Sequence, residues 1–384
     1  MLFKQCDHNK SVKSWALPAS VLSHARQVGT AIRAGIAGLG GAPVRIDAHE
    51  MITGRAALLG LDPPTRIASG GASRLLAAVD GWCALTLSRA EDLEAVPALL
   101  ELPEVDDPWT SLAAAAIERP VADFVARARL LDLPAATLGE VGAAEPTVTQ
   151  HNAPSTRSIG DLLVVDMSSM WAGPMCGRLL AAGGATVVKV ETPARPDGTR
   201  SGDRRFFDWM NSEKLSFSAS FDSDELAGLL RAADVVIEGS RPAALARRCL
   251  SADKVPARPG RVWLRISGYG IGHPGRVAFG DDAAVAGGLV NVDEHRPVFC
   301  GDAIADPLTG LAGTAAVLDA LTRGGGVIIA VSMAAVAATY ADLPDSGVAE
   351  CERRMPELPA QPARELGADN SRVRALIEAR LVAC

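Results

Sequence analysis

A strand–loop–helix–strand unit between Asp161 and Glu191 constrains the fold more than any other part of the chain. Two short runs, LLVV at 162–165 and TVVKV at 186–190, have the β-branched composition of strands buried in a parallel sheet. Between them, apolar residues recur at helical spacing, and a glycine pair at 183–184 ends the helix. The pattern predicts a βαβ unit whose first loop faces the ligand crevice of the sheet.

The same alternation continues through residues 161–342. We predict helices over 224–232, 243–249 and 306–321, and strands over 234–239, 262–270 and 327–332. The longest apolar run, 327–340, is too short to span a bilayer and is better explained as a buried strand and helix. Alternating elements predict an α/β fold with a doubly wound, mainly parallel, Rossmann-like sheet.

The other residues form smaller segments. We expect an N-terminal helical lead at 1–45 with a helix at 21–39, a small α+β domain at 46–143, linkers at 144–160 and 343–365, and a C-terminal helix at 366–384. Within the small domain, we expect a strand at 82–88 and helices at 91–100 and 121–131. Polar, proline-containing composition identifies the linkers.

Charge and cysteine usage exclude several classes of protein. A net charge of −7 leaves no basic stripe for nucleic acid. The seven cysteines are scattered singly without a CxxC pair, which argues against a disulfide framework or a metal site and favours the cytoplasm. The N-terminal residues lack the apolar core of a signal peptide, so we expect neither secretion nor a membrane anchor.

A dehydrogenase is the first hypothesis for such a unit, because Glu191 could bind a ribose at the end of the second strand. The G-x-G-x-x-G fingerprint is absent, however. The loop offers only Gly173 before a proline, and Gly177 lies within the predicted helix. There is no P-loop sequence either. The loop therefore lacks the glycines that a classical NAD site needs, which argues against NAD as its ligand.

Five segments, taken in order, provide a more specific interpretation. They are WAGPMCGRLLAAGGATVVKVE at 171–191, ADVVIEGSRPAALARR at 233–248, RISGYGIGHPG at 265–275, GDAIADPLTGLAGTAAVLDAL at 301–321 and RGGGVIIAVSMAAV at 323–336. Together they resemble the conserved blocks of the family III CoA-transferases, the formyl-CoA and carnitine CoA-transferase type. The resemblance implies a CoA-transferase that exchanges CoA between an acyl-CoA thioester and a carboxylic acid.

One departure concerns the order of the parts. In this family a smaller domain normally follows the nucleotide-like domain, whereas the segment resembling it here, 70–141, comes first. The C-terminal stretch at 362–381 resembles the usual family tail. The resemblance thus implies a rearranged member. It also implies a homodimer, because family members form interlocked dimers, although the altered order puts the interlocking in doubt.

Asp306, in the sequence ADPLTG, is the predicted catalytic residue. On local sequence alone, a helix N-cap followed by Pro307 is the simpler interpretation. The resemblance favours catalysis, because the nucleophilic aspartate of the family occupies this place. We expect the helix dipole to keep the carboxylate ionised, so that it can attack an acyl-CoA thioester. Glycines at 70–71 and 301 are candidate donors to the resulting oxyanion.

Coenzyme A is the expected substrate, with no permanently bound cofactor and no metal. The resemblance assigns CoA binding to the loop Ser169, Met170, Trp171 and Ala172 and to Ala244 and Arg247. Arg241 is a further basic candidate for a phosphate, whereas Arg195 and Arg200 are better explained as surface charges. The acyl donor and acceptor cannot be named from these residues.

Two alternatives remain open. The superfamily includes α-methylacyl-CoA racemases, which use a histidine where this chain has FGDDAAV; none of its six histidines falls there. Asp281 or Asp282 stands in that place, and a solvated helix start is the simpler explanation of both. The second alternative is a non-catalytic CoA-binding protein, because the stretch from Gly280 to Gly301 is short for the family.

Overall fold

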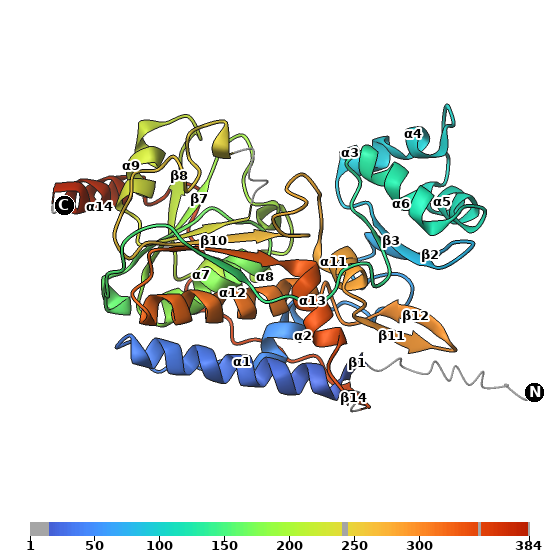
Figure 1. Ribbon diagram of the computed structural model, residues 1–384, viewed down its shortest axis with the longest axis horizontal. Helices are drawn as coiled ribbons and strands as arrows, with labels where there is room; N and C mark the ends of the chain where they lie inside the picture. The colour runs from blue at the N-terminus through green and yellow to red at the C-terminus, as the bar shows by residue number, and fades with distance from the viewer. Residues whose placement is uncertain (1–14, 240–244, 345–346, 383–384) are drawn as a thin grey trace, which may run out of the picture.

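A seven-stranded sheet forms the centre of the computed structural model, which describes residues 15–239, 245–344 and 347–382 (Figure 1). Its strand order is β5-β13-β10-β9-β6-β7-β8. The bounds are β5 Thr147–Gln150, β6 Leu163–Asp166, β7 Thr186–Glu191, β8 Leu215–Ser218, β9 Val235–Glu238, β10 Val262–Ser267 and β13 Val327–Ser332. The strands from β13 to β8 run parallel, and β5 pairs antiparallel with β13. The predicted α/β class with a mainly parallel sheet is confirmed.

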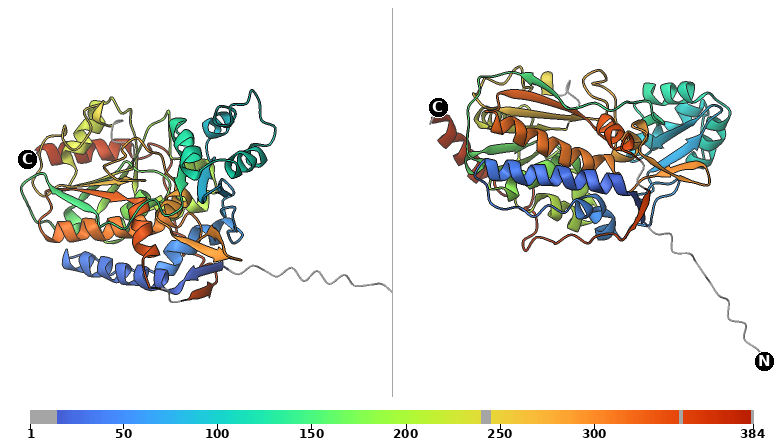
Figure 2. Two further views of the ribbon diagram at one scale, coloured as in Figure 1. Left: turned by 45° about the vertical axis from the view of Figure 1, so that its right-hand side comes forward. Right: turned by 60° about the horizontal axis from the view of Figure 1, so that its bottom comes forward.

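Helices cover both faces of this sheet (Figure 2). On one face, α7 (Ala172–Ala182) and α12 (Ala305–Thr322) pack together, and α1 (Ala19–Gly38) packs on α12 as an outer layer. On the other face lie α9 (Asp224–Ala232) and α14 (Asn370–Val382). Successive strand residues point to opposite faces, so Val164 belongs to the first core and Val165 to the second. Within α14, Val373 and Ile377 are buried, whereas Leu381 is exposed.

A smaller three-stranded antiparallel sheet lies beside the main sheet (Figure 1). Its strands are β2 (Ser73–Ala77), β3 (Trp82–Thr86) and β4 (Ala135–Thr137). The surrounding helices are α3 (Ala90–Glu94), α4 (Val96–Leu100), α5 (Pro108–Ile117) and α6 (Val121–Leu130). The single helix predicted at 91–100 is wrong because it is split at Ala95. Pro97 lacks the N–H that a continuous helix would need there.

The remaining elements lie outside these two sheets and the helices already described. They are α2 (Ala48–Leu59), α8 (Arg204–Asn211), α11 (Gly280–Ala286), α13 (Met333–Ala341), the hairpin β11 (Val290–Asp293) and β12 (Arg296–Phe299), the pair β1 (Trp15–Pro18) and β14 (Val348–Cys351), and 3₁₀ turns at Ile159–Asp161 and Gly198–Ser201. The short helix α11 packs on both β3 and β4 and on α12 and α13. It therefore joins the small sheet to the helices that cover the main sheet.

Sequence patterns missed β5 and β14, which lie within the predicted linkers. All four residues of β5 are exposed, so it lacks the apolar alternation that identifies a strand and is held by backbone pairing at the sheet edge. The helix predicted at 243–249 begins outside the described residues. In the described part of the chain, no helix combines the length and the apolar character needed to span a bilayer.

Candidate active site

Asp306 lies in the first turn of α12, as its second residue. The N-cap position belongs to Ile304, which offers no side-chain hydrogen bond, so the interpretation of Asp306 as the helix cap is wrong. Its backbone N–H donates to the carbonyl oxygen of Ala303 at 2.9 Å. The side chain is only partly exposed and accepts a hydrogen bond from the backbone of Ala172, the first residue of α7. Helices α7 and α12, which cover one face of the main sheet, thus meet at this carboxyl group.

Three more aspartates cluster near Asp306. Asp281 accepts hydrogen bonds from the Ser73 hydroxyl at 2.9 Å and from the Ala303 backbone N–H at 3.0 Å. Asp302, whose side chain is 2% exposed, pairs with the Arg55 guanidinium at 2.6 Å. These contacts bring α2, the small sheet, α11 and the start of α12 to one place. Arg55, Asp302 and Ser73 were not among the predicted site residues.

Asp282 completes the group, and it is 0% exposed. It accepts hydrogen bonds from the Phe279 backbone N–H at 2.8 Å, the Thr86 hydroxyl at 3.3 Å and the Tyr269 hydroxyl at 3.4 Å. The prediction of a solvated helix start for Asp281 and Asp282 is therefore wrong. Both residues do lie in the first turn of a helix, but the small sheet covers that turn.

Gly280, the first residue of α11, lies close to the start of α12. A Cβ atom added there would overlap with the Ala303 carbonyl oxygen and with Oδ2 of Asp306. The first of these is backbone and cannot turn away as a flexible side chain can. Glycine is therefore required at this position if the Asp306 carboxyl is to keep its place.

Burial dominates the electrostatics of this cluster. It raises the pKa of Asp306 to about 7, the pKa of Asp281 to about 6 and the pKa of Asp282 to about 7, and it raises the pKa of Asp302 as well. The positive charge of Arg55 acts in the opposite direction on Asp281, Asp302 and Asp306. The helix dipole and the hydrogen bond from Ala172 therefore do not outweigh the effect of burial, which favours the protonated form of Asp306.

We expect the stability of the folded protein to fall as the pH rises from 5 to 8. A carboxyl group with a raised pKa binds its proton more tightly in the folded state, so its stabilising effect is complete below the unfolded pKa of about 3.9 and is lost through pH 6–7. For Asp282, the loss is on the order of 2 kcal/mol. Urea unfolding at pH 5 and pH 8 measures it.

The Asp282→Asn variant is the control for this pH dependence. An amide can still accept the hydrogen bond from Phe279, but it does not titrate. The difference in unfolding free energy between pH 5 and pH 8 should shrink in this variant. An unchanged difference would show that Asp282 titrates normally.

The loop after β6 divides into an exposed and a buried half. Ser169 and Met170 are exposed, whereas Trp171 and Ala172 are buried. The Trp171 ring packs edge-on against Phe206, with 5.5 Å between ring centroids. Met170 has a φ of 72°, a left-handed conformation that is uncommon for a residue other than glycine. Its backbone N–H donates to the Asp197 carboxylate at 3.3 Å, which fixes that conformation.

A network of buried lysine and aspartate side chains holds this loop in place. The Lys189 ammonium donates to the Ser168 carbonyl oxygen and to Asp197, the latter at 2.8 Å. Lys214 donates to Asp166 at 2.8 Å. Lys189, Asp197 and Lys214 were not predicted to have a role in the site. A single lysine in a β-branched run gives no sign, in sequence alone, that it is buried with a partner.

Other predicted binding residues lie apart from the carboxyl cluster or outside the described residues. Arg247 and Arg195 are exposed, and Arg241 and Ala244 lie outside the described residues. The Arg200 side chain is only 12% exposed, pairs with Glu191 at 2.6 Å and stacks on Phe207, so the interpretation of Arg200 as a surface charge is wrong. This pairing also occupies Glu191, the residue considered for ribose binding.

The two glycine sites proposed as oxyanion donors differ in their surroundings. A Cβ at Gly70 would lie 3.7 Å from the Arg55 guanidinium, so this loop borders the carboxyl cluster. Gly301, with φ 70°, instead faces Leu17 and Ile304 in the core. Of the two candidates, the 70–71 loop is the one near Arg55.

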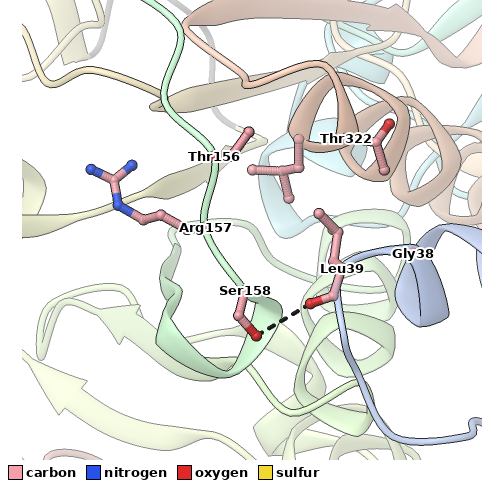
Figure 3. A pocket seen from close by; sticks show the side chains of 7 residues that line it. Gly38, Leu39, Thr156, Arg157, Ser158 and Thr322 are labelled. Carbon is pink, nitrogen blue, oxygen red and sulfur yellow. Dashed lines mark hydrogen bonds between the residues drawn. The ribbon is translucent and has the colours of Figure 1, made fainter.

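Two surface cavities are lined by residues other than those of the carboxyl cluster. One of about 330 Å³ is lined by Gly38, Leu39, Thr156, Arg157, Ser158, Leu321 and Thr322 (Figure 3). It lies at the C-terminal end of α12, about 24 Å along the helix from Asp306. A second, of similar size, is lined by part of β2, by the 65–67 segment, by Trp109 and Ala113 of α5, and by the β11–β12 hairpin. The carboxyl cluster is the better candidate for the site, because it combines aspartates of raised pKa with a buried ion pair to Arg55.

Despite the four aspartates, no three His, Cys, Asp or Glu side chains in the described ranges are arranged to hold a metal ion. Within the cluster, Arg55 already supplies a positive charge. The geometry can therefore position an acid that exchanges a proton near neutral pH or attacks as a carboxylate.

Known proteins resemble part of this chain. A model of "CoA-transferase family III" matches residues 159–356, just over half of the chain. An "Acyl-CoA transferase" of Fusarium pseudograminearum is 31% identical in an alignment of 197 residues that covers 45% of this chain and 43% of that protein. A "Succinyl-CoA--D-citramalate CoA-transferase" of Chloroflexus aurantiacus is 31% identical over 182 residues, covering 43% and 44%. A "Formyl-CoA:oxalate CoA-transferase" of Rhodopseudomonas palustris is 29% identical over 172 residues, covering 41% and 40%.

The match is partial in every case. The chain spans less than half the length of these curated relatives. Among solved structures, a hypothetical protein from Mycobacterium tuberculosis is 25% identical with a TM-score of 0.44, covering 49% of this chain and 57% of that one. A CAIB/BAIF family protein from Brucella suis is 26% identical with a TM-score of 0.44, covering 49% and 55%. On the family model, which matches more than half of its residues, this chain belongs to CoA-transferase family III.

Proposed function

We propose that the chain is a CoA-transferase that moves CoA between an acyl-CoA thioester and a carboxylic acid, with Asp306 as the nucleophile. Family membership supports the reaction class. The observation that carries the assignment is the contact between the Asp306 carboxyl and the backbone of Ala172, because it joins this group to the end of the loop assigned to CoA. If CoA binds along that loop, the thioester of the acyl-CoA would therefore lie beside the Asp306 carboxyl group.

The reaction is covalent catalysis by a carboxylate. One oxygen of ionised Asp306 attacks the thioester carbonyl carbon, and the carbon–sulfur bond breaks to give a mixed anhydride and CoA thiolate. The thiolate then attacks the aspartyl carbonyl carbon, which releases the first acid and leaves an aspartyl-CoA thioester. The incoming carboxylate attacks that thioester and displaces the thiolate, and the thiolate attacks the acyl carbon of the new anhydride to restore Asp306.

CoA binding is proposed for the residues named in the sequence. Ser169 and Met170 are exposed and can line a channel, whereas the buried Trp171 and Ala172 would act by shaping it. Exposed Arg247 is available for a phosphate. Arg241 and Ala244 keep their assignment from the resemblance alone. Titration calorimetry with CoA compares the Arg247→Ala variant with the wild type.

An isomerase acting on the α-carbon of an acyl-CoA is the second candidate. The observation that favours it is the pair Asp281 and Asp306, whose pKa values of about 6 and 7 suit proton exchange near neutral pH. Incubation of acyl-CoA substrates in deuterated water distinguishes the two reactions. Exchange at the α-carbon without transfer of CoA to an added acid would favour the isomerase.

A screen for acyl exchange tests the main proposal. Acyl-CoA thioesters are incubated with labelled acetate, succinate and longer acids, and labelled acyl-CoA is measured. We expect exchange for at least one pair of acyl-CoA and acid. CoA binding by calorimetry with no exchange for any pair would instead support a non-catalytic CoA-binding protein.

The organisation of the chain is part of the proposal. We infer a Rossmann-like domain at 161–342 preceded by a small α+β domain at 46–143, in an order rearranged from that of the family. The family model supports this because its match begins at residue 159, after the small sheet has ended. We also infer a homodimer, which size-exclusion chromatography with light scattering measures, and a cytoplasmic location, for which the scattered cysteines are the support.

A further inference from the structure

Arg55 is held in one orientation by an ion pair and two aromatic rings. Its guanidinium pairs with Asp302 at 2.6 Å and lies 5.7 Å from the ring centroids of both Trp171 and Phe206. Oδ2 of Asp302 is buried and has no hydrogen-bond partner among the described residues. The flat, delocalised guanidinium can stack on rings while its edge reaches a carboxylate, which an ammonium group cannot do as well.

The helix that carries Arg55 is itself fixed in place. The Asp47 side chain caps the start of α2 by accepting from the backbone N–H groups of His49 and Glu50. Gly54, next to Arg55, packs so closely on Trp209 that a Cβ there would lie 2.7 Å from the ring. The position of the Arg55 backbone is therefore set by packing, and its side chain, at 23% exposed, is directed to the cluster.

Arg55 is connected to Asp306 through the start of α7: its guanidinium lies 5.7 Å from the Trp171 ring centroid, and the backbone of the next residue, Ala172, hydrogen-bonds to the Asp306 carboxyl group. The charged groups that face Asp306 are Asp281 from α11, Asp302 from the turn before α12 and Arg55 from α2; α7 faces it with the backbone of Ala172. The two aspartates raise the pKa of Asp306, and Arg55 lowers it. Arg55 likewise opposes the effect of burial on Asp281 and Asp302.

We propose that Arg55 is a positioning residue for Asp306: held by Asp302 and by the Trp171 and Phe206 rings, it provides the positive charge that keeps the Asp306 carboxylate available for attack. The inference rests on the proposed function of Asp306. It also gives the N-terminal segment, which lies outside the family match, a direct role in the site. Asp302 acts on Asp306 indirectly, because it holds the Arg55 guanidinium in place.

Two measurements on the full chain follow the ionisation of Asp306. ¹³C NMR of aspartate-labelled protein, with the Asp306→Asn variant used to assign the signal, measures the pKa without any turnover. The pH profile of kcat for CoA exchange measures the same group during the reaction. In the Arg55→Met variant, both midpoints should rise by about one unit, because an adjacent arginine lowers a carboxyl pKa by about that much or more. Below the midpoint, exchange should be about tenfold slower.

Two further variants separate this role from a structural one. Arg55→Lys restores a charge without the stacking, so its midpoint should lie between those of the wild type and Arg55→Met; if Arg55→Met does not fold, the upward shift in Arg55→Lys carries the test. Arg178→Met is the matched control, because Arg178 also stacks on a tryptophan, 5.6 Å from the Trp209 ring centroid, but is not among the groups acting on Asp306. It should leave both midpoints unchanged.

The outcomes are distinct. An unchanged NMR midpoint in the Arg55 variants overturns the proposal, and so does a change confined to the KM for the acid, which would make Arg55 a substrate-binding residue. A shifted NMR midpoint in a protein that exchanges CoA with no acid supports the role of Arg55 and contradicts the proposed function instead.

Discussion

Replacement of Asp306 by asparagine should lower the rate of CoA exchange by about a thousandfold or more. The amide keeps the size of the side chain, but it cannot attack a thioester to give an anhydride, so the covalent route is lost. The measurement is kcat for transfer of CoA to a labelled acid, at a pH above 8 where the wild-type carboxyl, with its pKa of about 7, is ionised.

Stability measurements distinguish this chemical effect from misfolding. The buried carboxyl of Asp306 opposes folding when it is ionised, because its pKa is raised in the folded state. The asparagine variant should therefore be at least as stable as the wild type in urea at pH 8. A variant that unfolds more easily and also loses activity would not support a catalytic role, and one that retains full exchange would exclude it.

Replacement of Lys214 by methionine should destabilise the fold by about 3–5 kcal/mol. The Lys214 ammonium is fully buried and donates to Asp166 and Pro174 at 2.8 Å each and to Asn211 at 2.9 Å. Methionine fills a similar volume but leaves the Asp166 carboxylate, which is 0% exposed, with less compensation for its burial. Urea unfolding at pH 7 measures the loss.

A double-mutant cycle isolates the interaction. Asp166→Asn combined with Lys214→Met removes both charges, so the double variant should be less destabilised than the sum of the two single variants. Arg205→Met is the control, because the Arg205–Asp203 pair lies at the surface and its removal should leave the unfolding free energy unchanged within error. Additive effects at 166 and 214 would contradict a coupled buried pair.

The elements around the βαβ unit could be predicted because their sequence patterns are local. The helix over 224–232 and the strand over 327–332 have the predicted bounds, and α12 differs from its prediction by one residue at each end. Asp306 was singled out by its place in a recognisable segment. Its high pKa was not foreseen, because a helix terminus predicts an ionised carboxylate and burial acts in the opposite direction.

The groups around Asp306 could not be predicted for a physical reason. Arg55 and Asp302 are 247 residues apart in sequence, and α2 carries no motif that marks one arginine as buried against rings. Ser73 and Thr86 come from an antiparallel pair of strands whose packing on α11 is set by the tertiary fold. The pair Asp281–Asp282 resembles a solvated helix start because nothing local shows that another sheet covers it. Contacts of this kind come from the arrangement of the two sheets.

Mass spectrometry of the trapped acyl-enzyme tests the central claim most directly. The protein is incubated with an acyl-CoA that supports exchange and then treated with hydroxylamine or borohydride, which convert an aspartyl anhydride or thioester into a hydroxamate or a homoserine. We predict that Asp306 is modified, that the modification depends on acyl-CoA, and that it is absent from the Asp306→Asn variant. Exchange that proceeds with Asp306 unmodified, or with the label on Asp281 or Asp302, would contradict it.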